Sequence, residues 1–237
     1  MTQPEPSKGF YQRWLSPDGY LGLHLTAGFA IALIAGLSFQ LIADEVFETP
    51  GIRSADAAAQ AYVDSIDSPE MTALIRGITF FGNSSSVLVL SLTVGLILFF
   101  RRSRRRLYAF ASIMAGGGLL NVLLKHGFQR DRPDVSHLVV AHGYSFPSGH
   151  AMGSMLFFGG LAYVVFFTAQ RHPFWRVVGI LGCLVATLLI GASRIYLGVH
   201  YLSDVAAGLV AGLCWIGVCV SGTKGWIRLR DRRRMAQ

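Results

Sequence analysis

Six long apolar runs constrain this chain more than any other feature. Each holds few or no charged side chains and comes close to, or exceeds, the roughly 20 residues that an α-helix needs to cross the hydrocarbon core of a bilayer. Backbone amides find no water there, so such runs fold as helices. The expected spans are 21–43, 71–100, 107–124, 151–169, 177–192 and 200–220. We therefore predict an all-α, polytopic membrane protein, a bundle of six transmembrane helices.

The charged residues lie between the apolar runs and mark the two sides of the membrane. Of the 21 Lys and Arg residues, 15 fall in segments that six alternating spans put on one side: 1–20, 101–106, 170–176 and 222–237. The positive-inside rule makes that side cytoplasmic. We expect cytoplasmic termini on a multi-pass protein of the cell (inner or plasma) membrane. This topology explains the net charge of +8, so we expect the lipid bilayer, and no nucleic acid, as a partner.

The segment 44–70, between the first two spans, should lie on the extracytoplasmic side. It carries seven acidic residues and one basic residue, and a short surface helix is expected around 57–66. Residues 68–70, Ser-Pro-Glu, are typical of a helix start: a capping hydroxyl, a proline in the first turn and an acid near the positive helix end. The dipeptide Gly82-Asn83 predicts a kink in the second span.

Polar residues gather in three clusters between residues 125 and 204, each at the end of an apolar run. The clusters are Lys125 with Arg132-Pro133; Pro147-Ser148-Gly149-His150; and Ser193-Arg194 with His200 and Asp204. All three face the expected extracytoplasmic side, where the positive-inside rule disfavours cations. Cations kept on that side need a reason, and an anionic ligand is one.

The side chains of these clusters suit a phosphate group. Lysine supplies a point charge and arginine a planar bidentate fork, and a phosphoryl group in reaction carries charge on its equatorial oxygens. Ser148 can cap the helix that follows it, and the free amides at a helix start form an anion site. His200 and Asp204 are four residues apart at the expected start of a helix. They should share one face, so that the carboxylate orients the imidazole.

Each cluster alone also has a plain structural explanation. Lys125 and Arg132 could anchor helix ends at the lipid headgroups, and Ser148 could serve only as a cap. His200 and Asp204 could form a structural helix pair. A metal site is not expected, because the histidines and aspartates of the loop have no regular ligand spacing and the cysteines lie inside apolar runs. These residues are His126, Asp131, Asp134, His137 and His142, with Cys183, Cys214 and Cys219.

The combination resembles the type 2 phosphatidic acid phosphatase family. The family pattern is Lys-x6-Arg-Pro, then Pro-Ser-Gly-His, then Ser-Arg-x5-His-x3-Asp, and this chain matches every position of it over about residues 125–204. The six-span layout extends the resemblance to most of the chain. It implies one phosphatase domain over residues 1–237, with the catalytic motifs in 125–204 and short cytoplasmic tails at 1–20 and 222–237. It also implies a reaction without metal or other cofactor.

The resemblance further implies a role for each motif residue. His200 would attack phosphorus, with Asp204 orienting it, and His150 would protonate the leaving oxygen and then help to activate water. The residues implied to bind the phosphate are Lys125, Arg132, Ser148, Gly149 and Arg194.

The expected substrate is the phosphate or diphosphate of a membrane lipid. Undecaprenyl diphosphate is the first choice, because the compact chain shows no extra domain; phosphatidylglycerophosphate, phosphatidic acid and lipid A phosphate are the alternatives. A lipid-to-lipid phosphotransferase stays open, as does a lipid transporter or scaffold with a vestigial site. Vanadium-dependent haloperoxidases resemble the family at the same motifs, but they are soluble, and the apolar runs argue against one. We make no prediction of the oligomeric state.

Overall fold

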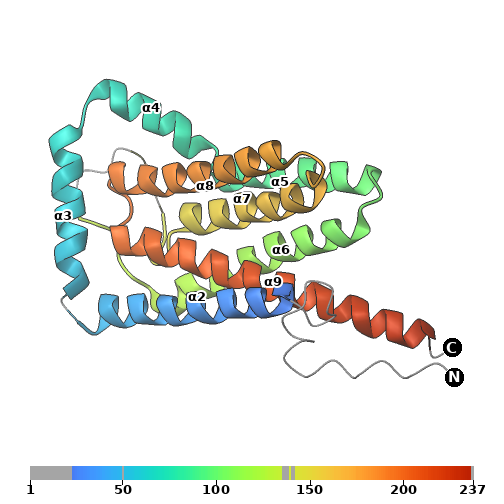
Figure 1. The fold of residues 1–237 in the computed structure, drawn as a ribbon. Helices are drawn as coiled ribbons and strands as arrows, with labels where there is room; N and C mark the ends of the chain where they lie inside the picture. The colour runs from blue at the N-terminus through green and yellow to red at the C-terminus, as the bar shows by residue number, and fades with distance from the viewer. Residues whose placement is uncertain (1–22, 50, 135–138, 140–141, 236–237) are drawn as a thin grey trace, which may run out of the picture.

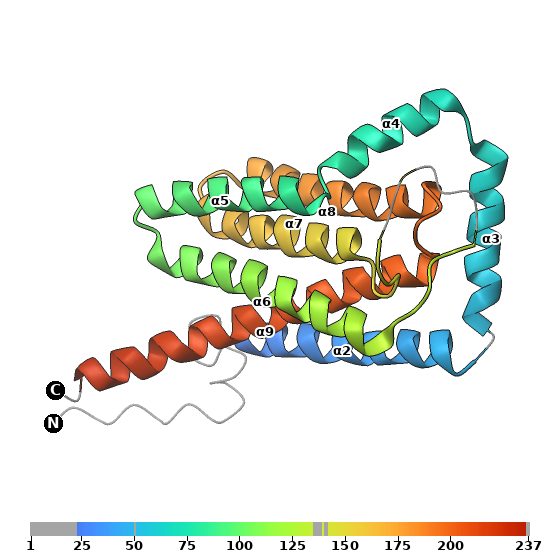
Figure 2. The same cartoon turned by 180° about the vertical axis from the view of Figure 1, so that it is seen from behind.

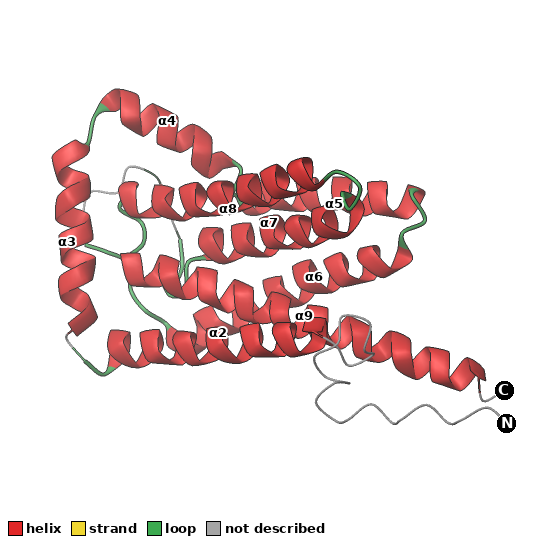
Figure 3. Ribbon diagram, in the orientation of Figure 1, coloured by secondary structure: helices red, strands yellow, loops and turns green. Residues whose placement is uncertain are grey.

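The computed structural model describes residues 23–49, 51–134, 139 and 142–235, and every regular element within these ranges is a helix (Figures 1 and 3). The helices are α2 (Leu23–Phe47), α3 (Gly51–Ile66), α4 (Pro69–Phe80), α5 (Ser84–Phe100), α6 (Arg104–Phe128), α7 (Gly149–Thr168), α8 (Pro173–Tyr196) and α9 (Leu202–Met235). The predicted all-α class is confirmed.

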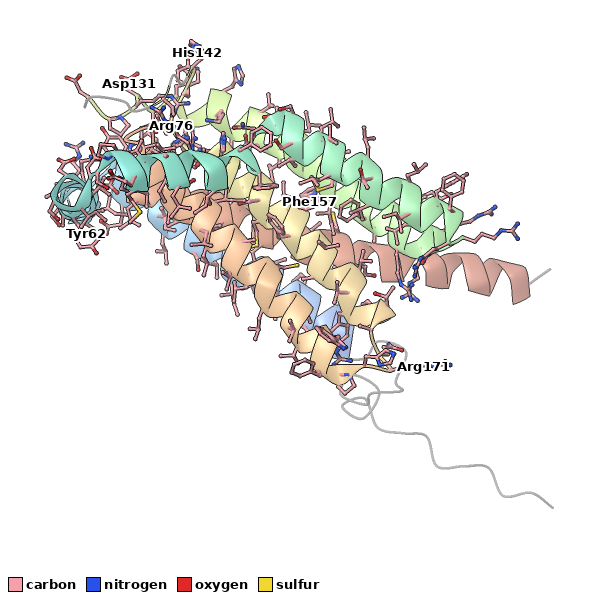
Figure 4. All side chains as sticks on the ribbon, turned by 90° about the horizontal axis from the view of Figure 1, so that it is seen from above. Tyr62, Arg76, Asp131, His142, Phe157 and Arg171 are labelled. Atoms are coloured by element: carbon pink, nitrogen blue, oxygen red, sulfur yellow. The ribbon has the colours of Figure 1, made fainter. Side chains whose placement is uncertain are left out.

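The helices form a bundle that is covered at one end by α3. Helices α2 and α5 to α9 run side by side, whereas α3 lies across the end of the bundle and α4 descends obliquely from it (Figures 1 and 2). Helix α9 packs against α2, α6, α7 and α8 and so forms the centre of the bundle. Tyr62 of α3 and the loop residues Asp131 and His142 lie at one end, and Arg171 lies at the other (Figure 4).

The described residues contain six candidate membrane spans when α4 and α5 are counted together. Five single helices are long and apolar enough to cross a membrane, and α4 with α5 forms a sixth span that bends by 44° at its break. The break falls at residues 81–83, which confirms the kink predicted at Gly82-Asn83. Ser68 caps α4 by accepting a hydrogen bond from the Met71 amide at 3.2 Å, as the sequence predicted. The expected surface helix is α3, which begins at Gly51 rather than near residue 57.

Both ends of the last span differ from the prediction. Helix α9 begins at Leu202, so His200 precedes the helix instead of opening it. The same helix continues to Met235, and the basic segment from residue 222 is therefore helical where it is described. The segment 1–20 lies outside the described residues.

The bundle exposes large apolar side chains along its length. Phe29, Trp175 and Phe100 are 65%, 65% and 73% exposed, which would be costly in water. A surface of this kind is solvated by lipid tails. The chain is a multi-span membrane protein.

Two glycines bring the starts of α7 and α9 together. A Cβ atom at Gly208 would lie 2.7 Å from the Ser148 carbonyl oxygen, and one at Gly212 would lie 2.9 Å from the Cβ of Met155. Small residues permit such close helix approach in membranes. The contact places the second polar cluster directly beside the third.

Candidate active site

The three clusters meet at the end of the bundle that α3 covers. Lys125 lies in the last turn of α6, Arg194 in the last turn of α8, and Ser148 immediately before α7. The backbone amide of Ser148 donates to the carbonyl oxygen of Asp204 at 3.0 Å, and this bond ties the second cluster to the third. Residues nearly 80 positions apart in sequence are thereby assembled into one polar cluster.

His200 and Asp204 pair, although not as neighbours on a helix. Nδ1 of His200 lies 3.5 Å from Oδ2 of Asp204, and the Tyr201 amide donates to the same oxygen at 2.9 Å. The expected shared helix face was wrong, because the chain leaves α8 through a turn at Gly198, whose φ is +70°, and α9 starts only at Leu202. The turn folds the imidazole back over the carboxylate, so the pairing itself is confirmed.

The other ring nitrogen of His200 faces a cation. Nε2 of His200 lies 3.4 Å from Nη1 of Arg132. A guanidinium only donates, so this contact and the carboxylate at Nδ1 together favour the tautomer with its proton on Nδ1. Burial lowers the pKa of His200 to about 4, with Arg132 and Lys125 acting in the same direction and Asp204 opposing them. His200 is therefore neutral at pH 7, with an unprotonated Nε2.

Three backbone carbonyls hold Arg132 in place. Its Nε donates to Gly143 O at 3.0 Å, Nη1 to Val199 O at 2.7 Å and Nη2 to His142 O at 2.9 Å. Each of its three nitrogens is thus anchored, and the plane of the fork is fixed beside His200.

Arg132 and the other two motif cations have no acidic partner. Nζ of Lys125 donates to the Tyr144 carbonyl oxygen at 2.5 Å, and Nη1 of Arg194 donates to Oγ1 of Thr79 at 3.0 Å. Arg194 is only 5% exposed, and its Nε has no hydrogen-bond partner in the part of the chain that the structure describes. Within that part, neither Lys125 nor the two arginines form an ion pair with a carboxylate. Buried cations without counter-charges are expensive, and a bound anion would supply the missing charge.

The start of α7 faces these cations. The hydroxyl of Ser148 accepts from the Ala151 amide at 3.4 Å, which makes it the N-cap that the sequence predicted. A Cβ at Gly149 would lie 3.6 Å from Cε of Lys125, so the lysine stem runs past the helix start. Helix amides and the lysine ammonium can therefore act on one anion.

His150 makes a contact that the motifs do not predict. Its Nε2 lies 2.9 Å from Oδ1 of Asn83, at the break between α4 and α5. The amide oxygen accepts, so Nε2 carries a proton. The sequence marked Asn83 only as a kink, and it gave no sign that the kink would lie against the second histidine.

Other polar residues around the motifs were missed as well. Ser145 is completely buried and donates to Oδ2 of Asp204. The hydroxyl oxygen of Thr79 accepts a hydrogen bond from Nη1 of Arg194, and Nη1 of Arg130 donates to Oδ1, the other carboxylate oxygen of Asp204. Nothing in the spacing of the motifs points to these partners, since they come from other helices or from unmarked loop positions. In the described ranges no three His, Cys, Asp or Glu side chains group in a way that could hold a metal ion, and His137 lies outside those ranges.

Comparison with known proteins shows the family of the chain. The family model of the PAP2 superfamily matches residues 106–228, a range that contains all three clusters. Phosphatidylglycerophosphatase B of Bacillus subtilis is 35% identical over 179 residues, which cover 74% of this chain and 86% of the relative. Decaprenylphosphoryl-5-phosphoribose phosphatase of Mycobacterium tuberculosis is 32% identical over 173 residues, covering 71% of this chain and 89% of the relative.

A solved structure extends the similarity to the fold. The crystal structure of a transmembrane PAP2-type phosphatidylglycerolphosphate phosphatase from Bacillus subtilis superposes with a TM-score of 0.72 at 31% identity, over 81% of this chain and 94% of the other. Family model, relatives and fold all indicate the same family. The chain belongs to the PAP2 superfamily and is a membrane lipid phosphatase.

Proposed function

We propose that this phosphatase hydrolyses a lipid phosphate or diphosphate through a phosphohistidine on His200. The observation that carries the proposal is the unprotonated Nε2 of His200 beside the fork of Arg132, with Asp204 behind the ring. A phosphate bound by Arg132 would present its phosphorus to that nitrogen. A nucleophile oriented by a carboxylate is typical of covalent catalysis.

The reaction would proceed in two displacements. Nε2 of His200 forms a bond to phosphorus while the bond from phosphorus to the lipid oxygen breaks, and His150, starting as an imidazolium, gives one of its two ring protons to that oxygen and becomes neutral. In the second step His150 takes a proton from water, the water oxygen attacks phosphorus, and the nitrogen–phosphorus bond breaks. The cations Lys125, Arg132 and Arg194 would stabilise the equatorial oxygens in both transition states.

An apolar cavity suits the tail of the lipid. It has a volume of about 1110 Å³ and is lined by α5, α6 and α7, from Gly149 and Asn121 beside the clusters to Phe99 and Leu107 near the other end. The cavity therefore follows α5, whose 17 residues correspond to roughly 25 Å of helix. We propose that the substrate keeps its chain in this groove while the phosphate reaches the cations.

Phosphatidylglycerophosphate leads the candidate substrates. The relative that is 35% identical and the solved structure that is 31% identical are both named for that activity. Polyprenyl phosphates come next, because the Mycobacterium tuberculosis relative and a putative undecaprenyl-diphosphatase of Escherichia coli, 36% identical over 110 residues, are named for such lipids. Undecaprenyl diphosphate, our first choice from the sequence, is one of these polyprenyl lipids and therefore ranks after phosphatidylglycerophosphate.

We also propose an orientation. Positive charges at the turn 101–106 and at the C-terminal end of α9 favour a cytoplasmic location for that end of the bundle. The site would then face the extracytoplasmic side. A reporter fused after Gln237 should behave as cytoplasmic, and an extracytoplasmic reporter would reverse the side on which we place the chemistry.

The deciding experiment is phosphate release by the purified protein in detergent, with chelator present. The panel holds phosphatidylglycerophosphate, phosphatidic acid, undecaprenyl diphosphate and a lipid A phosphate, and His200→Ala is the control. Turnover that resists chelator and disappears in the variant supports the histidine mechanism, and the ranking of rates identifies the substrate. Turnover that needs a divalent metal, or that persists in His200→Ala, would overturn it.

A further inference from the structure

A buried carboxylate connects the crosswise helix α3 to the candidate site. Asp56 is the only buried residue of α3 and is 5% exposed. Its Oδ1 accepts from the Ser203 amide at 2.9 Å, and its Oδ2 accepts from the Ser203 hydroxyl at 2.7 Å and from Nη2 of Arg130 at 3.0 Å. A buried carboxylate is retained only where its partners compensate for lost hydration, and here both oxygens are satisfied.

Arg130 joins this carboxylate to the catalytic one. Its Nη2 contacts Asp56, and its Nη1 contacts Oδ1 of Asp204 at 2.6 Å. Nη1 also donates to the Ser203 hydroxyl at 2.8 Å, and the guanidinium carbon lies 4.0 Å from the centre of the Tyr201 ring. One planar fork therefore bridges two carboxylates, a geometry that arginine supports and lysine does not.

The bridge divides the two oxygens of Asp204 between different partners. Oδ1 is taken by Arg130, whereas Oδ2 receives His200 Nδ1, the Tyr201 amide and the Ser145 hydroxyl. A carboxylate held at only one oxygen can rotate about its last bond. With Arg130 on the opposite oxygen, rotation of Asp204 would break an ion pair, and Oδ2 stays directed at the imidazole.

Arg130 is distinct from the phosphate-binding cations in both neighbours and position. Unlike Arg132, it is already paired with two carboxylates, and it lines a separate cavity of about 640 Å³ between α3 and the loop together with Asp56 and Tyr201. Its charge is thus compensated inside the protein. It is not available to a substrate phosphate, and any effect on the reaction must pass through Asp204.

We propose that Asp56 and Arg130 are positioning residues, which hold Asp204 in the orientation that keeps His200 ready for attack. The inference rests on the proposed role of His200. It gives α3 a part in the reaction: the helix supplies the outer carboxylate of an Asp–Arg–Asp–His chain without touching the substrate. If Asp56 served only to dock α3 to the bundle, its hydrogen bonds to Ser203 would be enough. The ion pair between Nη1 of Arg130 and Asp204 would then not be needed.

The first test separates turnover from substrate binding. Asp56→Asn and Arg130→Gln are compared with Asp64→Asn, an exposed residue of the same helix bonded to Gln60, using the lipid that the wild type hydrolyses fastest. We expect kcat to fall by up to about 100-fold in the first two variants, because small misplacements of reacting groups cost that much. KM should change little, and Asp64→Asn should match the wild type. Unchanged kcat in Asp56→Asn and Arg130→Gln would overturn the proposal.

The second test asks whether the effect passes through Asp204. Each substitution is repeated in an Asp204→Asn background, and the fold-losses in kcat are compared as a double-mutant cycle. A positioning role predicts that Asp56→Asn costs almost nothing once the catalytic carboxylate is gone. An equal fold-loss in both backgrounds means an independent structural role and refutes the inference.

Two controls keep the outcome clear. If Asp56→Asn does not elute and melt like the wild type, Arg130→Lys, which keeps the charge but can make only one of the two contacts, takes its place in the same cycle. Persistent turnover in His200→Ala would instead remove the proposed function on which the inference rests. The two failures are therefore distinguishable.

Discussion

Replacing Arg132 by lysine tests whether the shape of its fork matters beyond its charge. The guanidinium is held by three backbone carbonyls at 2.7 to 3.0 Å, and a lysine ammonium could keep about one of these bonds. Each lost bond is worth about 0.5–1.5 kcal/mol net, so losing two costs about 1–3 kcal/mol. If all of the energy that holds the fork in place is lost from transition-state binding, then at about 1.4 kcal/mol for each tenfold change in rate kcat/KM falls by about 5- to 150-fold.

The assay is steady-state phosphate release on the preferred lipid, together with thermal unfolding of the purified variant. Arg53→Lys is the matched control, since Arg53 is exposed on α3 at the same end of the bundle and its substitution should leave kcat/KM unchanged. A folded Arg132→Lys variant whose kcat/KM stays within about threefold of the wild type would refute the reasoning. Charge alone would then explain the role of this residue, and the fixed plane of the fork would be irrelevant.

Three further predictions concern His200, Asn83 and Gly208. The unfolded chain takes up a proton on His200 near its ordinary pKa of 6.5, whereas the folded protein holds that pKa at about 4. Stability should therefore fall as pH drops from about 6.5 to 4, and thermal unfolding in detergent should show a smaller fall in His200→Gln. Asn83→Ala removes the acceptor of His150 and should lower kcat by about tenfold on a lipid phosphate. The loss should be smaller on p-nitrophenyl phosphate, whose leaving group needs little protonation; equal losses would contradict a role for Asn83 through the acid. Gly208→Ala forces a Cβ to within 2.7 Å of the Ser148 carbonyl oxygen and should cost about 1–3 kcal/mol. Gly118→Ala, where a Cβ would meet nothing within 4 Å, should unfold no earlier than the wild type.

The sequence predicts the spans because every segment that crosses the bilayer must be long and apolar, and such runs are easy to recognise. The motif residues can also be recognised from the sequence, since Lys125, His150 and Arg194 are polar groups at places where the composition is otherwise apolar. Their assembly also followed from topology, which puts alternate helix ends on one side.

The partners of the motif residues could not be predicted from the sequence. Asn83 and Asp56 are ordinary residues of a kink and of an acidic segment, and only the fold shows that one lies against His150 and the other behind Arg130. The same is true of the turn at Gly198, which carries His200 out of the helix that its spacing from Asp204 suggested. Local patterns specify helices, whereas contacts between segments more than 60 residues apart depend on how the helices pack.

The position of the cavity among α5, α6 and α7 has a consequence for how substrate and products reach and leave the site. The cavity follows the bundle axis along α5, whereas His142 and Gly143, whose carbonyl oxygens hold Arg132, are exposed at the end of the bundle. If the substrate keeps its chain in this cavity, as we propose, a lipid would enter from its own leaflet and return to it without its chain leaving the hydrocarbon, and the freed phosphate would leave toward water at the end of the bundle. The lipid product and the phosphate would then leave by different routes, and apolar and anionic inhibitors would act on different parts of the enzyme.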